Sequence, residues 1–263
     1  MTRLWFEQAL LPEGWADAVA VEVEDGQIAS VTANAPRDGA ETFAGAAVPG
    51  LANLHSHAFQ RGMAGLTERR GETSDSFWTW RETMYRFLSR LTPDDVEAVA
   101  AELYAEMLEA GFTSVGEFHY LHHAPDGGPY DNRAEMAVRI AAATAETGIG
   151  LTLLPVLYET GSFGGAPSTE GQRRFVNDID RYLDLVEGSR AAVRDLPDAV
   201  VGVAPHSLRA VPPASLDRVV AAFPDGPVHI HAAEQRKEVD DCLAWSGRRP
   251  VAWLLENQPV DAR

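Results

Sequence analysis

Two patterns of hydrophobic and polar positions divide the chain. Between Asp17 and Val31 apolar residues alternate with polar ones, and a single Asp25-Gly26 pair interrupts the alternation. A period of two is typical of a half-buried strand, and an Asp-Gly pair between two such runs predicts a tight hairpin, because both turn residues must tolerate a positive φ. Residues 1–47 are therefore expected to form a small antiparallel β unit.

From Val48 onward, short apolar runs alternate with amphipathic segments. Runs that are continuously apolar are typical of parallel strands covered by helices on both faces. Such a domain is expected over residues 48–263, with five βα units. A closed barrel contains eight such units and an open doubly wound sheet can have five, so the strand count leaves both open. The five runs are Val48–Leu54, Phe112–Phe118, Gly150–Leu157, Val200–Ala204 and Pro227–Ala232.

The amphipathic segments carry signals for helix starts and ends. Thr92 can cap a helix that begins at Pro93, and Gly111 can end it. Asp94 and Asp95 suit the positive end of the same helix. Three further helices are expected over Asn132–Gly148, Gly171–Gly188 and Pro250–Asn257.

The amino-acid composition excludes several classes of protein function. Hydrophobic residues make up 45% of the 263 residues, which is enough for a large core and excludes global disorder. The 39 acidic and 22 basic residues give a formal net charge of −17, which disfavours binding to nucleic acid or to an anionic membrane. Cys242 is the single cysteine, and no apolar run reaches the roughly 18 residues of a membrane span. We expect a soluble, cytoplasmic protein without nucleic-acid or membrane partners.

Histidines stand at the predicted carboxyl ends of the strands, which is where the ligand sites of α/β proteins lie. His55 and His57 end the first run. Residues i and i+2 of a strand point to the same side, so both imidazoles can meet one metal ion, and zinc is suited to such nitrogen ligands. Simple packing or solvent exposure is the alternative explanation for this pair.

The end of the fifth run repeats this spacing and adds a carboxylate, in His229-Ile230-His231-Ala232-Ala233-Glu234. His231 as a third ligand and Glu234 as a proton shuttle would suit a metal-dependent hydrolase. Alternatively, Glu234 is an ordinary acid at the start of a helix. His229 is expected to pack beside the site without binding the metal.

Two other strand ends carry polar side chains. His206 follows the fourth run and can bind a substrate, and Arg209 can hold a carboxylate by two parallel hydrogen bonds, unless it is a plain surface residue. His119, His122 and His123 end the second run. A solvated rim explains these three as well as a metal site does, so none of them is assigned to metal.

Together these motifs resemble the amidohydrolase superfamily and, within it, the formimidoylglutamate deiminases. The resemblance implies a (β/α)8 metal-dependent hydrolase barrel with a small N-terminal β-sandwich unit. Residues 1–47 would be the N-terminal part of that unit, and residues 48–263 would be the first five βα units of the barrel. The segments that carry the resemblance are Pro49–Gly62, Phe77–Arg81, Ala204–Arg209 and His229–Gln235.

The resemblance also implies one divalent metal ion, with zinc as the first choice and iron(II) as the alternative. Its ligands would be His55, His57 and His231, plus an aspartate from strand eight. Binuclear relatives use a carboxylated lysine on strand four, but the only lysine here, Lys237, follows the fifth strand, so composition excludes that arrangement. Glu234 is the implied catalytic residue. The implied substrate-binding residues are Gln60, Arg81, Tyr120, His206 and Arg209.

The implied reaction is the hydrolytic deimination of N-formimidoyl-L-glutamate, a small anionic amidine, to N-formyl-L-glutamate and ammonia in histidine degradation. The catalytic histidine of strand six and the metal-binding aspartate of strand eight have no counterpart before Arg263, so we expect the N-terminal part of an enzyme. Two alternatives stay open: an aminohydrolase that acts on a nucleobase or related heterocycle, and an inactive fragment. The sequence does not determine the native metal or the oligomeric state, for which a homodimer is one option.

Overall fold

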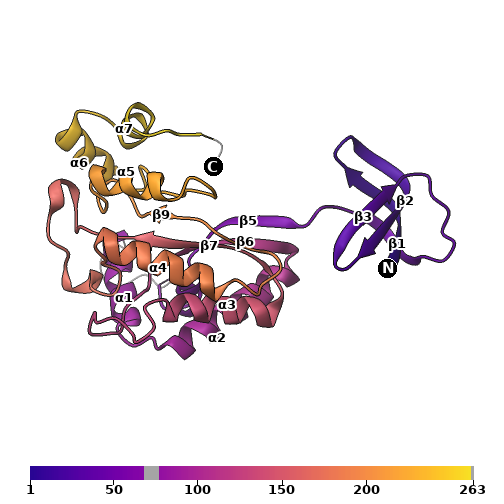
Figure 1. The fold of residues 1–263 in the computed structure, drawn as a ribbon, viewed down its shortest axis with the longest axis horizontal. Coiled ribbons are helices and arrows are strands. Elements are labelled where there is room, and N and C mark those ends of the chain that lie inside the picture. Colours follow the sequence, from indigo (N-terminus) through magenta and orange to yellow (C-terminus); the bar gives the residue numbers. More distant parts are fainter. Residues whose placement is uncertain (68–76, 262–263) are drawn as a thin grey trace. The chain divides into compact units, whose positions relative to one another are not determined.

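The computed structural model describes residues 1–67 and 77–261 of the chain. The chain divides into two compact units, Met1–Leu51 and Ala52–Arg263. Figure 1 shows that the first unit consists of strands, whereas the second combines strands with helices.

The first unit is one four-stranded sheet in the order β3-β2-β1-β4. The predicted hairpin joins β2 to β3, and its turn residues Asp25 and Gly26 have positive φ values of 50° and 79°. The prediction of a wholly antiparallel unit was wrong, because β4 pairs with β1 in parallel after a long connection. The strands are β1 (Thr2–Leu11), β2 (Gly14–Glu24), β3 (Gln27–Thr32) and β4 (Glu41–Ala47).

A small core holds this sheet and the β3–β4 connection together. The indole of Trp5 is buried against Ala20 and Ala35, and its Nε1 donates a hydrogen bond of 2.8 Å to the Ala35 carbonyl oxygen. The Arg37 guanidinium covers the Trp5 ring at 4.1 Å from its centroid, which is a favourable cation–π distance.

The second unit is built on a parallel sheet in the order β5-β6-β7-β8, as the continuously apolar runs predict. The fourth run forms two short strands, β8 and β9, and both pair with β7. The neighbouring side chains Leu153 and Leu154 point to opposite faces of β7 and are both completely buried, which confirms that this strand is covered on both faces. The strands are β5 (Leu51–Ser56), β6 (Phe112–His119), β7 (Gly150–Leu157), β8 (Ala199–Val201) and β9 (Ala204–Pro205).

The prediction of a fifth strand over Pro227–Ala232 was wrong, because these residues do not form a continuous strand. This segment runs parallel to residues 203–207 but makes only two isolated bridges, Val203 to Val228 and Ser207 to His231. Backbone hydrogen bonds such as that from the His229 N–H to the Val203 carbonyl oxygen, 3.0 Å long, still align it with the sheet. His231 therefore keeps the place that a strand end would give it.

Helices α2, α3 and α4 lie along the sheet, and α2 and α3 pack side by side (Figure 1). Helix α2 confirms its predicted cap, because the Thr92 hydroxyl accepts from the Asp95 N–H and the Asp95 carboxylate accepts from the Thr92 N–H. Gly148 ends α3 in the left-handed region, at φ 77°. The bounds are α1 (Phe77–Leu88), α2 (Pro93–Glu109), α3 (Glu135–Thr147), α4 (Ile179–Ala192), α5 (Pro213–Ala222), α6 (Arg236–Ser246) and α7 (Pro250–Asn257).

The helix predicted over Gly171–Gly188 begins later and ends later than expected. Asp178 caps α4 by accepting from the Arg181 N–H, and the helix continues beyond Gly188. The preceding residues form two short 3₁₀ turns, Phe163–Gly165 and Glu170–Gln172, within a long loop after β7. This loop borders the candidate site.

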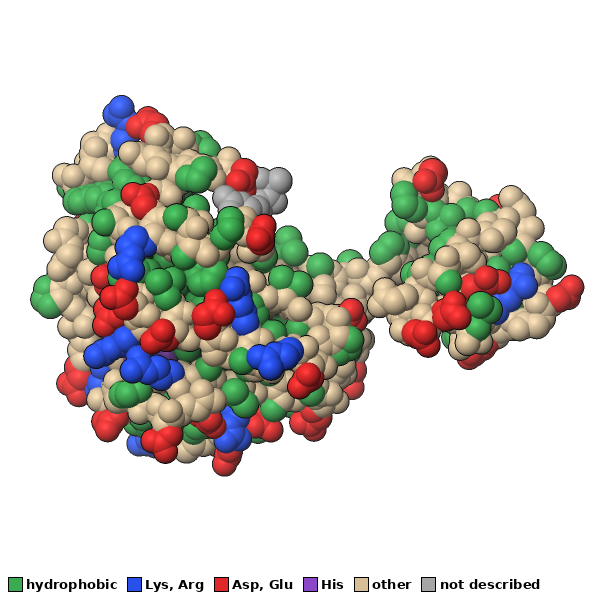
Figure 2. All heavy atoms as spheres, in the orientation of Figure 1, with side chains coloured by type: hydrophobic (Ala, Val, Ile, Leu, Met, Phe, Trp, Pro, Cys, Tyr) green, Lys and Arg blue, Asp and Glu red, His purple; other side chains and the backbone are tan. Residues whose placement is uncertain are grey.

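Charge is distributed over the second unit without a single dominant patch on the visible face. Figure 2 shows acidic and basic side chains interspersed there. Lys237, the only lysine, lies on α6 and pairs with Asp241 at 2.7 Å. Among the described residues, no helix has the length and apolar character needed to cross a membrane.

Candidate metal and substrate site

The first two histidines of the site project from the carboxyl end of β5. His55 and His57 point to the same side, as the strand period predicts, and their Nε2 atoms lie 3.1 Å apart. The Nδ1 atom of His57 lies 2.9 Å from the Phe118 carbonyl oxygen. A carbonyl can only accept, so Nδ1 of His57 carries the proton and Nε2 presents a lone pair to the site.

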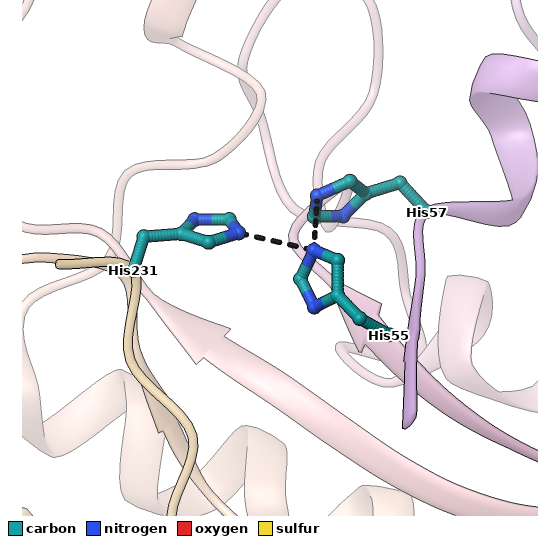
Figure 3. A group of neighbouring side chains, drawn as sticks. All are labelled: His55, His57 and His231. Carbon is teal, nitrogen blue, oxygen red and sulfur yellow. Dashed lines mark hydrogen bonds between the residues drawn. The ribbon is translucent and has the colours of Figure 1, made fainter. Parts of the chain in front are cut away.

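The third histidine comes from a distant part of the chain. The His231 N–H donates to the His206 carbonyl oxygen at 2.9 Å, and this bond places the His231 imidazole opposite His55. Its Nε2 lies 3.1 Å from Nε2 of His55. Figure 3 shows the three imidazoles converging, two from β5 and one from the segment that runs beside β9.

The contacts among these nitrogens fit a shared cation. An imidazole nitrogen has either one hydrogen or one lone pair, so Nε2 of His55 cannot donate to one neighbour and also accept from the other. In a tetrahedral zinc site with Zn–N distances of about 2.0–2.1 Å, two ligand nitrogens lie about 3.3 Å apart. The observed separations of 3.1 Å are close to that value.

The protonation of the three rings also suits metal binding. Burial is the main cause that lowers the pKa of His57 to about 4 and that of His231 to about 3, and the neighbouring histidines contribute to both values. The pKa of His55 is lowered as well, mainly by burial. Because metal ligation requires the neutral imidazole, the site is prepared to bind a cation.

A buried glutamate fastens the end of β5 to β6. The Ala58 N–H, directly after His57, donates a hydrogen bond of 2.7 Å to Oε1 of Glu117. Close strand approach is also needed here, because a Cβ atom at Gly116 would lie 2.8 Å from the Leu54 carbonyl oxygen. Glu117 and Gly116 thus set the position of the first two histidines.

Glu234 and Arg209 face each other across the site. Glu234 precedes α6, and the acidic residue in the first turn of that helix is Glu238, which accepts from the Glu234 N–H at 2.9 Å. One carboxylate oxygen of Glu234 lies 3.9 Å from an Nη atom of Arg209. Burial raises the pKa of Glu234 above its ordinary value, and Arg209 partly opposes that change.

A single pocket collects the residues that the sequence singled out, except His55. It brings together His57, His231, Glu234 and all five predicted substrate-binding residues, which are Gln60, Arg81, Tyr120, His206 and Arg209. Five further side chains complete the wall, and sequence reasoning missed them: Trp80, Met84, Tyr85, Tyr158 and Phe175. The side chains of Phe77 and Trp78, which carry part of the Phe77–Arg81 resemblance, lie outside the described residues.

Contacts within the pocket position several of the predicted substrate-binding residues. The Gln60 amide donates to the Tyr120 hydroxyl at 2.9 Å, and that hydroxyl lies 3.4 Å from the sulfur of Met84. The Arg81 guanidinium carbon lies 5.7 Å from the centre of the Tyr85 ring. Burial lowers the pKa of His206 well below its ordinary value, so this ring is neutral.

Tyr158 is the missed residue with the most direct contact to a predicted one. Arg209 donates from Nη1 to the Tyr158 hydroxyl at 2.9 Å, and the Tyr158 ring packs against His206 with centroids 4.6 Å apart. Tyr158 follows β7 directly, so the rule that places ligands at strand ends could have found it. No feature of the sequence could have indicated Gln172, which reaches the same hydroxyl from the following loop.

The histidines after β6 do not form a solvated rim, which corrects that alternative. His119 and His122 are each 1% exposed, and Nε2 of His122 bonds to the Val156 carbonyl oxygen at 2.9 Å. His123 bonds in the same way to the Val176 carbonyl oxygen. Within residues 1–67 and 77–261, the one group of three converging side chains that could hold a metal ion is His55, His57 and His231.

The loop after β7 is anchored to the segment that follows α1. The buried Arg174 guanidinium donates to the carbonyl oxygens of Leu88, Leu91 and His123. Tyr85 packs closely on the same loop, because a Cβ atom at Gly171 would lie 2.3 Å from the ring. These contacts fix the pocket wall that Tyr85 and Tyr158 form.

Two family models match the chain. The amidohydrolase family model matches residues 46–256, and the model of the formimidoylglutamate deiminase HutF N-terminal domain matches residues 1–44. The first match covers most of the chain and agrees with the α/β fold and the histidine cluster. The chain therefore belongs to the amidohydrolase family.

Curated relatives refine this placement. The chain is 55% identical over 265 residues to the formimidoylglutamate deiminase of Pseudomonas aeruginosa, and the match covers 100% of this chain and 58% of that protein. It is 28% identical over 274 residues to the 8-oxoguanine deaminase of the same organism, covering 97% of this chain and 57% of that protein. The chain thus spans less than two thirds of the length of either relative.

Solved structures agree with the fold. A crystal structure of an amidohydrolase from Brucella melitensis has 57% identity and a TM-score of 0.97, covering 100% of this chain and 58% of that chain. A zinc-bound adenosine deaminase from Xanthomonas campestris has 22% identity and a TM-score of 0.68, covering 97% of this chain and 54% of that chain. The second likeness concerns the fold alone.

Proposed function

We propose that this protein is a metal-dependent deiminase that hydrolyses N-formimidoyl-L-glutamate to N-formyl-L-glutamate and ammonia, a step of histidine degradation. The observation that carries the proposal is one pocket that joins metal-binding histidines, a carboxyl group of raised pKa and two arginines. The 55% identity to a formimidoylglutamate deiminase supports it.

The charge of the pocket suits a substrate with two carboxylates. In a chain with a formal net charge of −17, an anion is repelled before it reaches the surface. Arg81 and Arg209 line the pocket and offset that repulsion locally. Each guanidinium can hold a carboxylate through paired N–H donors. In this proposal Gln60, Tyr120 and His206 supply uncharged hydrogen-bonding groups to the rest of the substrate.

Glu234 is proposed as the group that moves protons. It accepts one proton from the water that attacks the formimidoyl carbon and passes it to the imino nitrogen. It then carries the remaining hydroxyl proton of the tetrahedral carbon adduct to the same nitrogen, so the C–N bond breaks, a C=O bond forms and ammonia leaves. A carboxyl group of raised pKa exchanges protons more readily near neutral pH. A divalent metal held by His55, His57 and His231, with zinc proposed and iron(II) as the alternative, would supply Lewis acidity that lowers the pKa of water.

The direct test is ammonia release from N-formimidoyl-L-glutamate. The protein is prepared without metal and then supplied with zinc or with iron(II), both as the 263-residue chain and as the longest protein that its gene encodes. The proposal expects metal-dependent release of one ammonia per substrate. No ammonia from any combination of chain and metal would contradict it.

A charge variant separates this proposal from a nucleobase aminohydrolase, the activity class of the 8-oxoguanine deaminase relative. Arg209→Met should abolish most activity on the dianionic substrate, whereas activity on a neutral base would change little. Arg218→Met is the matched control, since Arg218 is exposed and pairs with Asp180 outside the pocket. A cytoplasmic location and a homodimer stay predictions, which cell fractionation and light scattering would check.

A further inference from the structure

The hydroxyl of Tyr158 stands between two groups that can only donate hydrogen bonds. Arg209 donates to it from Nη1 at 2.9 Å, and the Gln172 amide donates from Nε2 at 2.6 Å. The Tyr158 side chain is 3% exposed and lines the pocket. Its position is therefore fixed on two sides by protein groups, at the wall of the pocket.

The orientation of the Gln172 amide is determined by its own contacts. Its Oε1 accepts from the Thr169 N–H at 2.7 Å and from the Thr169 hydroxyl at 3.1 Å, because both residues belong to the capping box of a 3₁₀ turn. A backbone N–H can only donate, so the atom facing it is the amide oxygen. The NH₂ group must then point at Tyr158, and Gln172 is buried at 2% exposure.

The Tyr158 hydroxyl has one hydrogen that neither Arg209 nor Gln172 can accept. A tyrosine hydroxyl has one proton to donate and two lone pairs that accept. Arg209 and Gln172 occupy both lone pairs, and neither has a lone pair that could take the Tyr158 proton. Within the described part of the chain no group accepts this proton, so it is available to an acceptor in the pocket.

We propose that Tyr158 is a substrate-binding residue, which donates its hydroxyl proton to the same carboxylate that Arg209 holds, and that Gln172 is the positioning residue that aims this proton. The inference rests on the proposed function, because it requires an anionic substrate in this pocket. It adds a donor that selects for a carboxylate next to Arg209. A substrate without that carboxylate would gain nothing from it.

The test compares Tyr158→Phe with Tyr182→Phe in the metal-loaded protein. Both rings are buried and lie near β7, but the Tyr182 hydroxyl bonds to the Pro155 carbonyl oxygen at 2.9 Å and is not part of the pocket. Tyr158→Phe should raise KM for N-formimidoyl-L-glutamate about 10- to 100-fold with kcat changed little, as expected when one hydrogen bond to a charged group is lost in ground and transition states alike. Tyr182→Phe should leave KM unchanged.

A binding measurement gives a second readout without turnover. Calorimetry with N-formyl-L-glutamate, the proposed product, should show the same 10- to 100-fold weakening for Tyr158→Phe. Gln172→Met removes the donor that aims the hydroxyl, so it should weaken binding in the wild-type background. It should have no further effect in the Tyr158→Phe background, because its influence passes through the missing hydroxyl.

The outcomes separate the two proposals. If the wild type releases ammonia and Tyr158→Phe binds product within twofold of it, the role of Tyr158 is overturned and the proposed function stands. Additive effects of Gln172→Met and Tyr158→Phe would overturn the positioning role of Gln172. Circular dichroism shows whether Tyr158→Phe folds. If it does not, the test uses Gln172→Met instead, and product binding by Gln172→Met within twofold of the wild type would overturn the proposal. A wild type that neither binds product nor releases ammonia overturns both proposals.

Discussion

Glu117 offers the sharpest physical prediction, because it is a carboxyl group enclosed in the sheet beside the cluster of His55, His57 and His231. It lies on β6 and is 1% exposed. Burial raises its pKa from 4.5 to about 7, although the Ala58 N–H and the Ser56 and Tyr104 hydroxyls favour the ionised form. Glu117 therefore binds a proton more tightly in the folded protein than in the unfolded chain.

The sign and size of the effect follow from that difference. Because the folded state has the higher pKa, the stabilising contribution is complete below about pH 4.5 and is lost as the pH rises through about 7. Integrating proton binding from pH 5 to pH 8 gives a loss of about 2.5 kcal/mol in the free energy of unfolding from this one group. Glu117→Gln removes the titration while its amide oxygen can still accept from the Ala58 N–H.

The assay is urea unfolding of wild type and Glu117→Gln at several pH values between 5 and 8. Far-ultraviolet circular dichroism follows the second unit, because the described helices all lie there. The wild type should lose about 2.5 kcal/mol more than the variant over this range. Glu109→Gln, at an exposed glutamate of α2, is the matched control and should follow the wild type. Parallel curves for wild type and Glu117→Gln would refute the argument that burial of this carboxyl group controls the pH dependence.

Three further predictions concern a close packing contact, a buried guanidinium and a helix cap. Gly171→Ala should cost about 1–3 kcal/mol in the free energy of unfolding, because the new methyl group would lie 2.3 Å from the Tyr85 ring; an unchanged urea midpoint would show that the loop moves freely. Arg174→Met should cost about 3 kcal/mol or more, because it leaves buried carbonyl oxygens unpaired, and Arg174→Lys should recover part of the loss in the same assay. Thr92→Ala should cost about 1 kcal/mol through loss of the cap of α2, and hydrogen exchange should locate the loss in the first turn of that helix.

Sequence patterns correctly predicted the elements that are determined by residues close together in the chain. The Asp25-Gly26 hairpin and the cap at Thr92 depend on residues within four positions of each other, so the sequence displays them completely. The convergence of His55 and His57 depends only on the strand period. The addition of His231 required one further rule, that the ends of parallel strands meet at the same edge of the sheet.

The predictions that were wrong concern segments whose structure is determined by contacts with residues far away in the sequence. The predicted helix start at Gly171 was wrong because residues 170–172 form a 3₁₀ turn that packs on Tyr85, and a helix propensity pattern cannot show that contact. The fifth run makes isolated bridges because its neighbours in space, and not its own residues, determine strand pairing. Burial of His119 and His122 could not be predicted for the same reason, since two histidines at and after the end of a strand look polar in any local pattern.

The geometry of the candidate site is therefore held largely by residues that do not touch a substrate. Glu117 fixes the backbone after His57, Gln172 orients the Tyr158 hydroxyl, and Arg174 ties the loop of Gln172 to the end of α1. Each of these buried side chains makes its bonds to groups more than ten residues away, except for the local cap of Gln172. Substitutions at these three positions should change metal affinity or substrate affinity without removing any group that binds either, because the ligands would remain present but lose their alignment.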